Sequence, residues 1–301
     1  MNQHTEAATV TLHEDITMPA LGLGTYKLTG ASGQAAIEHA LEVGYRHLDT
    51  AQAYGNEAEV GAALRASGLP RSDVFVTTKL TADWFAPAER AVAHARAGIE
   101  TSLTALGLES VDQVLIHWPN PWRTAQEGTY RDLAAALAEL SGPSSGSGTT
   151  PDGAVSGALT RTWGVSNFLP EHLHILEADG LRAAVNQIQV DPLVQQRPVC
   201  RATVEHGAAV VAYMPLGRGG AAFEVPAVLE AARAHGVTPA QVLLRWHVQS
   251  GRVAVPRSSD PGRQAENLAL DGFALTAEQL AALDAADTGA PARQDAREFG
   301  I

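Results

Sequence analysis

The sequence predicts an α/β protein of the (β/α)8 TIM-barrel class, with an N-terminal β-hairpin that caps the bottom of the barrel. Its 301 residues, 45% of them hydrophobic, are enough to bury one large core. Short β-branched runs alternate with Ala-rich amphipathic stretches, which is typical of β-α units around a parallel sheet. Eight such alternations fit a closed barrel better than an open doubly wound sheet. We therefore expect residues 1–301 to form a single barrel domain.

Each element follows from a local pattern. The eight expected barrel strands are 21–26, 45–49, 74–79, 111–117, 161–166, 184–188, 209–214 and 253–256. Helical patterns lie between them, as in 87–106, where Pro87 suits a first helical turn and Gly107 a helix end. Residues 10–18 form two short runs around a turn, and they are the expected hairpin.

Two segments lack the apolar residues that order a chain. We expect residues 1–9 to be a mobile tail. Residues 141–157 form a Gly/Ser-rich tract with a single charge, Asp152, and we expect a mobile surface loop there. A linker between two domains is the alternative, although neither half would then close a sheet. Since the tract follows a helix and precedes a strand, it belongs on the face opposite the active site, and trimming it should leave kcat/KM nearly unchanged.

Composition excludes several classes of partner. The net charge of −12, without a run of Lys or Arg, argues against binding to nucleic acid or anionic lipid. Cys200 is the only cysteine, so neither an internal disulfide nor a CxxC metal site can form. We find no signal peptide and no apolar run long enough to span a membrane. We expect a cytoplasmic protein that is a monomer or weak oligomer and binds no metal.

Polar residues gather where the expected strands end, which is where a barrel of this class places its catalytic groups. Asp49 ends the second strand and Tyr54 follows it, while Lys79 and His117 end the third and fourth. Each has an ordinary alternative: a helix cap for Asp49, a solvated charge for Lys79 and a structural role for His117. The functional interpretation rests on all of them occurring at consecutive strand ends.

Together these side chains suit proton transfer to a carbonyl oxygen. A free tyrosine has a pKa of about 10 and is a poor acid at neutral pH. A nearby ammonium such as Lys79 lowers that pKa, and the Asp49 carboxylate keeps the lysine charged. Tyr54 is then a plausible general acid as hydride reaches the carbonyl carbon, and a neutral His117 is placed to orient the same oxygen.

Five segments resemble the signature segments of the aldo-keto reductases. They are GYRHLDTAQAYGNE at 44–57, TKL at 78–80, LIHWP at 115–119, GVSNF at 164–168 and PLGRG at 215–219. The resemblance extends from about residue 10 to 287 and is closest to bacterial, diketo-gluconate-reductase-like members. It implies a (β/α)8 barrel, the catalytic tetrad Asp49, Tyr54, Lys79 and His117, and reduction of an aldehyde or ketone to an alcohol by a nicotinamide cofactor.

The resemblance also implies how the cofactor binds. Ser166, Asn167 and Gln187 would bind the carboxamide, and Tyr213 would stack on the nicotinamide ring. The other implied cofactor residues are Thr25, Tyr26, Asp49, Pro215, Leu216, Gly217, Pro256, Arg257, Ser258, Ser259, Arg263, Glu266 and Asn267. Two arginines and hydroxyls at a helix start suit a 2'-phosphate, unless they are ordinary surface charges. We therefore expect NADPH rather than NADH, although Arg257 stands where the family more often has lysine.

The substrate pocket is expected to be lined by Tyr26, Trp84, His117 and Trp118. The alternative for Trp84 is that it only covers the barrel. Because the tail after residue 287 is short, we expect an open pocket. Gln189 and Asp191 stand where the family often has Glu and His.

Two other functions remain open on the sequence alone. One is a nicotinamide-binding regulatory or partner protein with little turnover, although the complete tetrad argues against this. Alternatively, an isomerase or aldolase could use Lys79 as a Schiff-base amine, with substrate phosphate bound after the eighth strand. The sequence does not identify the carbonyl substrate.

Overall fold

The computed structural model describes residues 8–12, 16–142 and 158–301, and its centre is a ring of eight parallel strands. The strands are β3 (Leu23–Gly24), β4 (His47–Asp49), β5 (Phe75–Leu80), β6 (Val111–Ile116), β7 (Thr160–Ser166), β8 (Val185–Gln189), β9 (Ala209–Tyr213) and β10 (Val253–Val255), paired in sequence order. A parallel bridge between Leu21 and Ala254 closes the ring. The predicted (β/α)8 barrel is confirmed.

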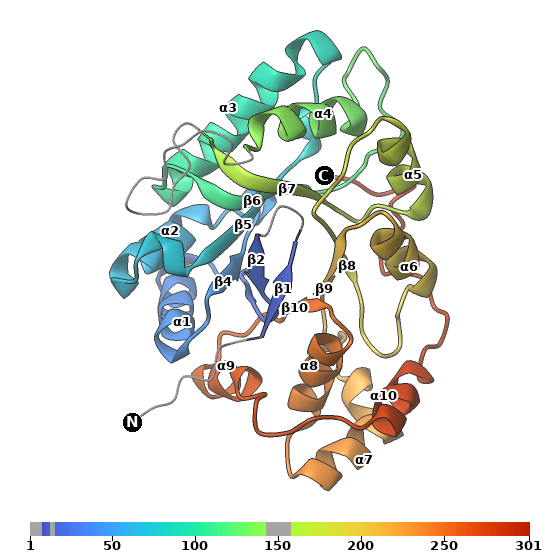
Figure 1. Cartoon of the computed structure of the whole chain (residues 1–301). Helices are drawn as coiled ribbons and strands as arrows, with labels where there is room; N and C mark the ends of the chain where they lie inside the picture. The colour runs from blue at the N-terminus through green and yellow to red at the C-terminus, as the bar shows by residue number, and fades with distance from the viewer. Residues whose placement is uncertain (1–7, 13–15, 143–157) are drawn as a thin grey trace.

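Helices surround this ring (Figure 1). They are α1 (Gly30–Val43), α2 (Glu57–Ser67), α3 (Ala88–Leu106), α4 (Tyr130–Leu140), α5 (Pro170–Ala178), α6 (Arg197–Glu205), α7 (Pro226–His235), α8 (Pro239–Gln249), α9 (Pro261–Leu268) and α10 (Ala277–Asp284). As expected, α3 starts just after Pro87 and ends before Gly107, which takes a left-handed conformation (φ 66°). Among the described residues, no helix combines the length and apolarity needed to cross a membrane.

The predicted hairpin is present and covers one end of the barrel. Strands β1 (Thr9–Thr11) and β2 (Thr17–Pro19) pair antiparallel, and Figure 1 shows them in the middle of the ring. Leu12, Ile16 and Met18 are buried in one cluster with side chains of the barrel interior. Thr9, the last residue of the expected mobile tail, pairs with Pro19. Residues 1–7 of the tail lie outside the described part of the chain.

Beyond the apolar cluster under the hairpin, the barrel interior contains polar side chains. His47 on β4 hydrogen-bonds Thr77 on β5 through Nε2 (3.2 Å), and Thr77 contacts Gln113 on β6 at 3.5 Å. A Cβ on Gly22 would lie 2.5 Å from His47 Nδ1, so only glycine fits beside this histidine. The polar layer lies directly beneath the carboxyl ends of the strands.

The chain on either side of the Gly/Ser-rich tract lies at the amino end of the strands. Ser141, which follows α4, bridges Thr160 at the start of β7. This agrees with the expected position opposite the carboxyl strand ends. Residues 143–157, which make up nearly all of the predicted loop, lie outside the described residues.

The residues after α10 return to the carboxyl ends of the strands. The Arg293 backbone N–H donates to Gln189 Oε1 at 3.0 Å, and the Ala82 N–H donates to the Ile301 carbonyl at 3.0 Å. The Phe299 ring packs edge-on against Trp118, with ring centroids 4.7 Å apart. We call residues 288–301 the C-terminal segment; it borders the active-site end of the barrel.

Candidate active site

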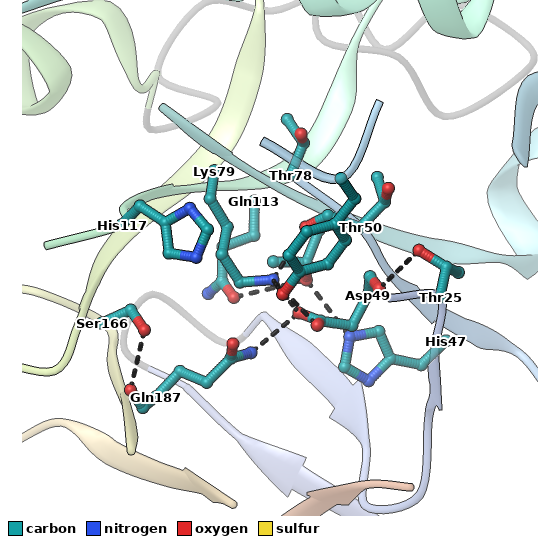
Figure 2. Close-up of polar contacts among 12 residues, drawn as sticks. Thr25, His47, Asp49, Thr50, Thr78, Lys79, Gln113, His117, Ser166 and Gln187 are labelled. Carbon is teal, nitrogen blue, oxygen red and sulfur yellow. Dashed lines mark hydrogen bonds and ion pairs between the residues drawn. The ribbon is translucent and has the colours of Figure 1, made fainter. Parts of the chain in front are cut away.

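Lys79 and Asp49 form a buried ion pair at the ends of β5 and β4. The ammonium donates to both Asp49 oxygens (2.9 and 2.8 Å), to the Thr50 carbonyl (2.8 Å) and to the Tyr54 hydroxyl (3.3 Å). The Lys79 side chain is fully buried, and that of Asp49 is only 4% exposed. Figure 2 shows Lys79 and Asp49 pointing toward one another, with His117 on the other side of Lys79. Lys79 therefore connects the carboxylate to the phenol.

The loop after β4 holds Tyr54 in place. At the start of this loop, the Thr50 backbone N–H donates a hydrogen bond to the Thr77 carbonyl. Asn56, which is completely buried, accepts from the Thr50 hydroxyl and donates to the Thr25 carbonyl at 2.8 Å. These hydrogen bonds satisfy buried polar groups that would otherwise lack partners, and they hold the loop in one conformation. Sequence reasoning did not identify Asn56 as a residue that positions the loop.

Burial and neighbouring charges set the protonation states. Burial raises the pKa of Tyr54, and Lys79 only partly opposes that shift. The expected lowering of this pKa is thus one contribution and not the net result. Burial alone would lower the pKa of Lys79, but Asp49 and Tyr54 raise it above its usual value. Tyr54 therefore carries its proton and Lys79 its positive charge at neutral pH.

His117 lies beside the tyrosine and is neutral. The rings of Tyr54 and His117 pack edge-on with centroids 5.9 Å apart. Burial, reinforced by the positive charge of Lys79, holds the pKa of His117 well below its usual value. Its Nδ1 is buried and has no hydrogen-bond partner among the described residues. A neutral imidazole beside Tyr54 is suited to hydrogen-bond a carbonyl oxygen.

The polar residues on β7, β8 and β9 reach the same site. The Gln187 amide donates to Asp49 Oδ1 at 2.7 Å, which links β8 to the ion pair. Ser166 donates to the Gln187 carbonyl, and Tyr213 donates to Asn167 Oδ1, both at 2.9 Å. Figure 2 shows Ser166 and Gln187 on the side of the site facing away from Thr25.

A cavity of about 620 Å³ lies over this cluster at the carboxyl ends of the strands. Most of the predicted site residues line it: Tyr26, Asp49, Tyr54, His117, Trp118, Ser166, Asn167, Gln187, Tyr213, Pro215, Leu216, Gly217, Pro256 and Arg257. Lys79 lies beneath the floor, in contact with Asp49 and Tyr54. The structure thus brings most of the residues predicted from the sequence together around one cavity.

Other predicted cofactor residues lie outside the cavity lining. Thr25 is buried, and its hydroxyl donates to the Asp49 carbonyl. Ser258, Ser259, Arg263, Glu266 and Asn267 belong to the loop after β10 and to α9, next to Arg257 in the chain. At the start of α9, the Asp260 side chain accepts the Arg263 backbone N–H at 2.8 Å, so this donor of the helix N-terminus already has a partner.

Trp84 does not line the cavity, so its predicted role in the substrate pocket is corrected. Its indole N–H donates to Gln52 at 2.6 Å, and its ring lies against Gly98 of α3, where a Cβ would come within 2.7 Å of it. Trp84 therefore covers the outside of the barrel. Trp118, in contrast, is buried and lines the cavity.

The C-terminal segment, although short, contributes to the wall of the cavity. The residues of this segment that line the cavity, and that sequence reasoning missed, are Arg293, Gln294, Phe299 and Ile301. The segment carries no helical or strand periodicity, so its path could not be predicted from the sequence.

Among the described residues, no cluster of three or more His, Cys, Asp or Glu side chains is arranged to hold a metal ion.

Comparison with known proteins agrees with this geometry. The profile of the Aldo/keto reductase family matches residues 20–288. This chain belongs to that family. An aldo-keto reductase of Mycolicibacterium vanbaalenii is 42% identical over 292 residues, covering 97% of this chain and 96% of that protein.

Two solved structures share the fold over nearly the whole chain. A mutant of Gox0644 in complex with NADPH superimposes with a TM-score of 0.84 at 30% identity, covering 98% of this chain and 100% of that one. The Bombyx mori aldo-keto reductase in complex with NADP gives a TM-score of 0.81 at 28% identity, covering 95% and 94%.

Proposed function

We propose that this family member reduces an aldehyde or ketone to an alcohol with NADPH, and that Tyr54 is the proton donor. The observation that carries the proposal is the buried contact of Tyr54 with the Lys79–Asp49 ion pair beneath a cavity that His117 also lines. Such a cluster supplies a proton and hydrogen bonds to a carbonyl oxygen, but no electrons. The family's nicotinamide cofactor fits that need.

The cavity has the groups that NADPH requires. Ser166, Asn167 and Gln187 offer donors and acceptors for a carboxamide, and Tyr213 offers an aromatic face at the same end. His117 Nδ1 is a buried polar atom still without a partner among the described residues. Arg257 also lines the cavity, and Arg263 follows it in the chain, on α9. Two solved relatives of this fold carry NADPH or NADP, which supports the same cofactor here.

The mechanism follows from the charges around Tyr54. NADPH, when bound, supplies a hydride to the carbonyl carbon. The Tyr54 hydroxyl donates its proton to the carbonyl oxygen, and the Lys79 ammonium stabilises the resulting phenolate at the 3.3 Å contact. Asp49 keeps Lys79 charged and fixed in position. His117, held neutral, hydrogen-bonds the carbonyl oxygen and orients it.

The geometry argues against Lys79 as a Schiff-base amine. A nucleophilic lysine must lose its proton, which requires a lowered pKa. Here Asp49 and Tyr54 raise that pKa, and the ammonium donates to four oxygen atoms. Lys79 is also fully buried and does not line the cavity. The other alternative, a regulatory or partner protein, would also bind the nicotinamide cofactor but would show little turnover.

The proposal is tested by following the loss of NADPH absorbance with a panel of aldehydes, ketones and dicarbonyls, beside parallel assays with NADH. Turnover that needs a carbonyl compound and is lost in Tyr54→Phe supports the proposal. The phenylalanine keeps the ring but removes the proton donor, so NADPH binding should remain. Tight NADPH binding without turnover would favour the regulatory alternative. Absence of NADPH binding would contradict the cofactor site.

A further inference from the structure

Arg293 is a positive charge in the active-site cavity that the proposed mechanism does not use. It lies in the C-terminal segment and lines the same cavity as Tyr54 and His117. Within the described residues its side chain makes no ion pair, although the protein as a whole is acidic. The other arginine of the segment, Arg297, pairs instead with Glu171 (2.7 Å) and Asp295 (3.5 Å). Arg293 therefore has its charge available to a ligand.

The charge balance of the cavity favours an anionic ligand. Its only lining carboxylate side chain among the described residues is Asp49, and Lys79 already neutralises it. The lining cations are Arg218, Arg257 and Arg293. Arg218 and Arg257 follow β9 and β10, on the side where the proposed cofactor site places the phosphates. Arg293 comes from another part of the chain.

The contact of the Arg293 backbone places it near the nicotinamide end of the cavity. Its N–H is bound by Gln189, whose amide in turn contacts Asp191 at 3.3 Å. Gln189 is two residues beyond Gln187 on β8, so the two side chains lie on the same face, about 7 Å apart along the strand. Gln187 belongs to the proposed carboxamide site. The Arg293 main chain is thus tied to β8, the strand that also carries Gln187.

Further along the C-terminal segment, an aromatic wall completes the pocket. Phe299 and Trp118 pack edge-on, and both line the cavity. The Ile301 carbonyl accepts the Ala82 N–H, which fastens the segment to the loop after β5. A substrate between the tetrad and this segment would therefore meet flat apolar surface together with a guanidinium, which binds carboxylates through paired hydrogen bonds.

We infer that Arg293 binds an acidic group of the substrate, so that the preferred substrates are aldehydes or ketones that also carry a carboxylate. The inference rests on the proposed function, because it concerns the same pocket. In this inference, Arg293 binds the anionic group of the substrate, whereas Arg218 and Arg257 bind the phosphates of the cofactor.

The test compares two aldehydes that differ only in charge, 4-carboxybenzaldehyde and its methyl ester, with wild-type protein and Arg293→Gln. The wild type should prefer the carboxylate. Arg293→Gln should lower kcat/KM for the carboxylate about tenfold or more, mainly through KM, and leave the ester nearly unchanged. Arg297→Gln is the matched control from the same segment, and it should change neither substrate.

Three results would overturn the inference. Equal losses for both aldehydes would mean that Arg293 only shapes the segment. Weaker NADPH binding in Arg293→Gln would assign the charge to a cofactor phosphate. If wild-type protein reduces neither aldehyde, the proposed function fails for these substrates, and calorimetry then compares binding of the two aldehydes. Equal affinity for the carboxylate and the ester would then reject the anion site as well.

Discussion

Replacing Lys79 with methionine should destabilise the protein as well as inactivate it. The substitution keeps the length of the side chain but removes the donor that serves Asp49, Thr50 and Tyr54. The Asp49 side chain is 4% exposed, so its carboxylate would remain buried, with the Gln187 amide as its one remaining side-chain donor among the described residues. Breaking a buried ion pair from one side costs about 3–5 kcal/mol. For a chain of this length the melting temperature should fall by about 5–8 °C.

The double variant Asp49→Asn/Lys79→Met separates charge from packing. With both charges gone, the neutral amide can still accept from Gln187, so most of the lost stability should return. Activity should remain absent, because Tyr54 no longer contacts an ammonium. Urea unfolding monitored by circular dichroism gives the free energy of unfolding of all three proteins.

If Lys79→Met is as stable as wild type at pH 7, or if the double variant is no more stable than the single one, the buried ion-pair reasoning is refuted.

Three further predictions concern the barrel and the cofactor. Burial lowers the pKa of His47 to about 4, so the unfolded chain takes up a proton between pH 6.5 and 4 while the folded barrel does not; stability should fall by up to about 3 kcal/mol as pH drops through that range, and a His47→Gln variant with the full decline would contradict this. In Gly61→Ala the new Cβ would lie 1.8 Å from the Leu106 carbonyl oxygen, so α2 and α3 must separate and the melting temperature should drop, whereas Gly272→Ala, with open space, should match wild type in thermal melts. Arg257→Ala should weaken NADPH binding about tenfold or more and leave NADH binding nearly unchanged in fluorescence titrations; equal weakening would remove Arg257 from the 2'-phosphate site.

The barrel, and the clustering of Asp49, Tyr54, Lys79 and His117, were predictable because their signals are local. Each inner strand is a short β-branched run, and a barrel brings all carboxyl strand ends to one face. Asp49 and Lys79 lie on adjacent strands, so their pairing follows once the sheet is parallel and in sequence order. Strand bounds were less certain: residues 21–26 contain only the two-residue strand β3, because Thr25 and Tyr26 already leave the sheet.

The errors concern contacts between residues far apart in the chain. Trp84 lies in the loop after β5 as expected, but the small Gly98 on α3 makes room for its indole outside the pocket. The C-terminal segment has no periodic pattern, and its path depends on single contacts such as Gln189 to Arg293. The pKa of Tyr54 depends on burial as well as on Lys79, and burial is a property of the whole fold.

The most direct test of the proposed reaction is the transfer of deuterium from NADPH labelled at C4 of its nicotinamide ring. The purified protein would be mixed with this cofactor and an aldehyde that it turns over, and the alcohol would be examined by mass spectrometry and NMR. We predict one deuterium on the carbinol carbon of the product, and none when Tyr54→Phe is used because no product forms. A product without deuterium, or one formed equally well in the absence of NADPH, would contradict hydride transfer and the role assigned to the tetrad.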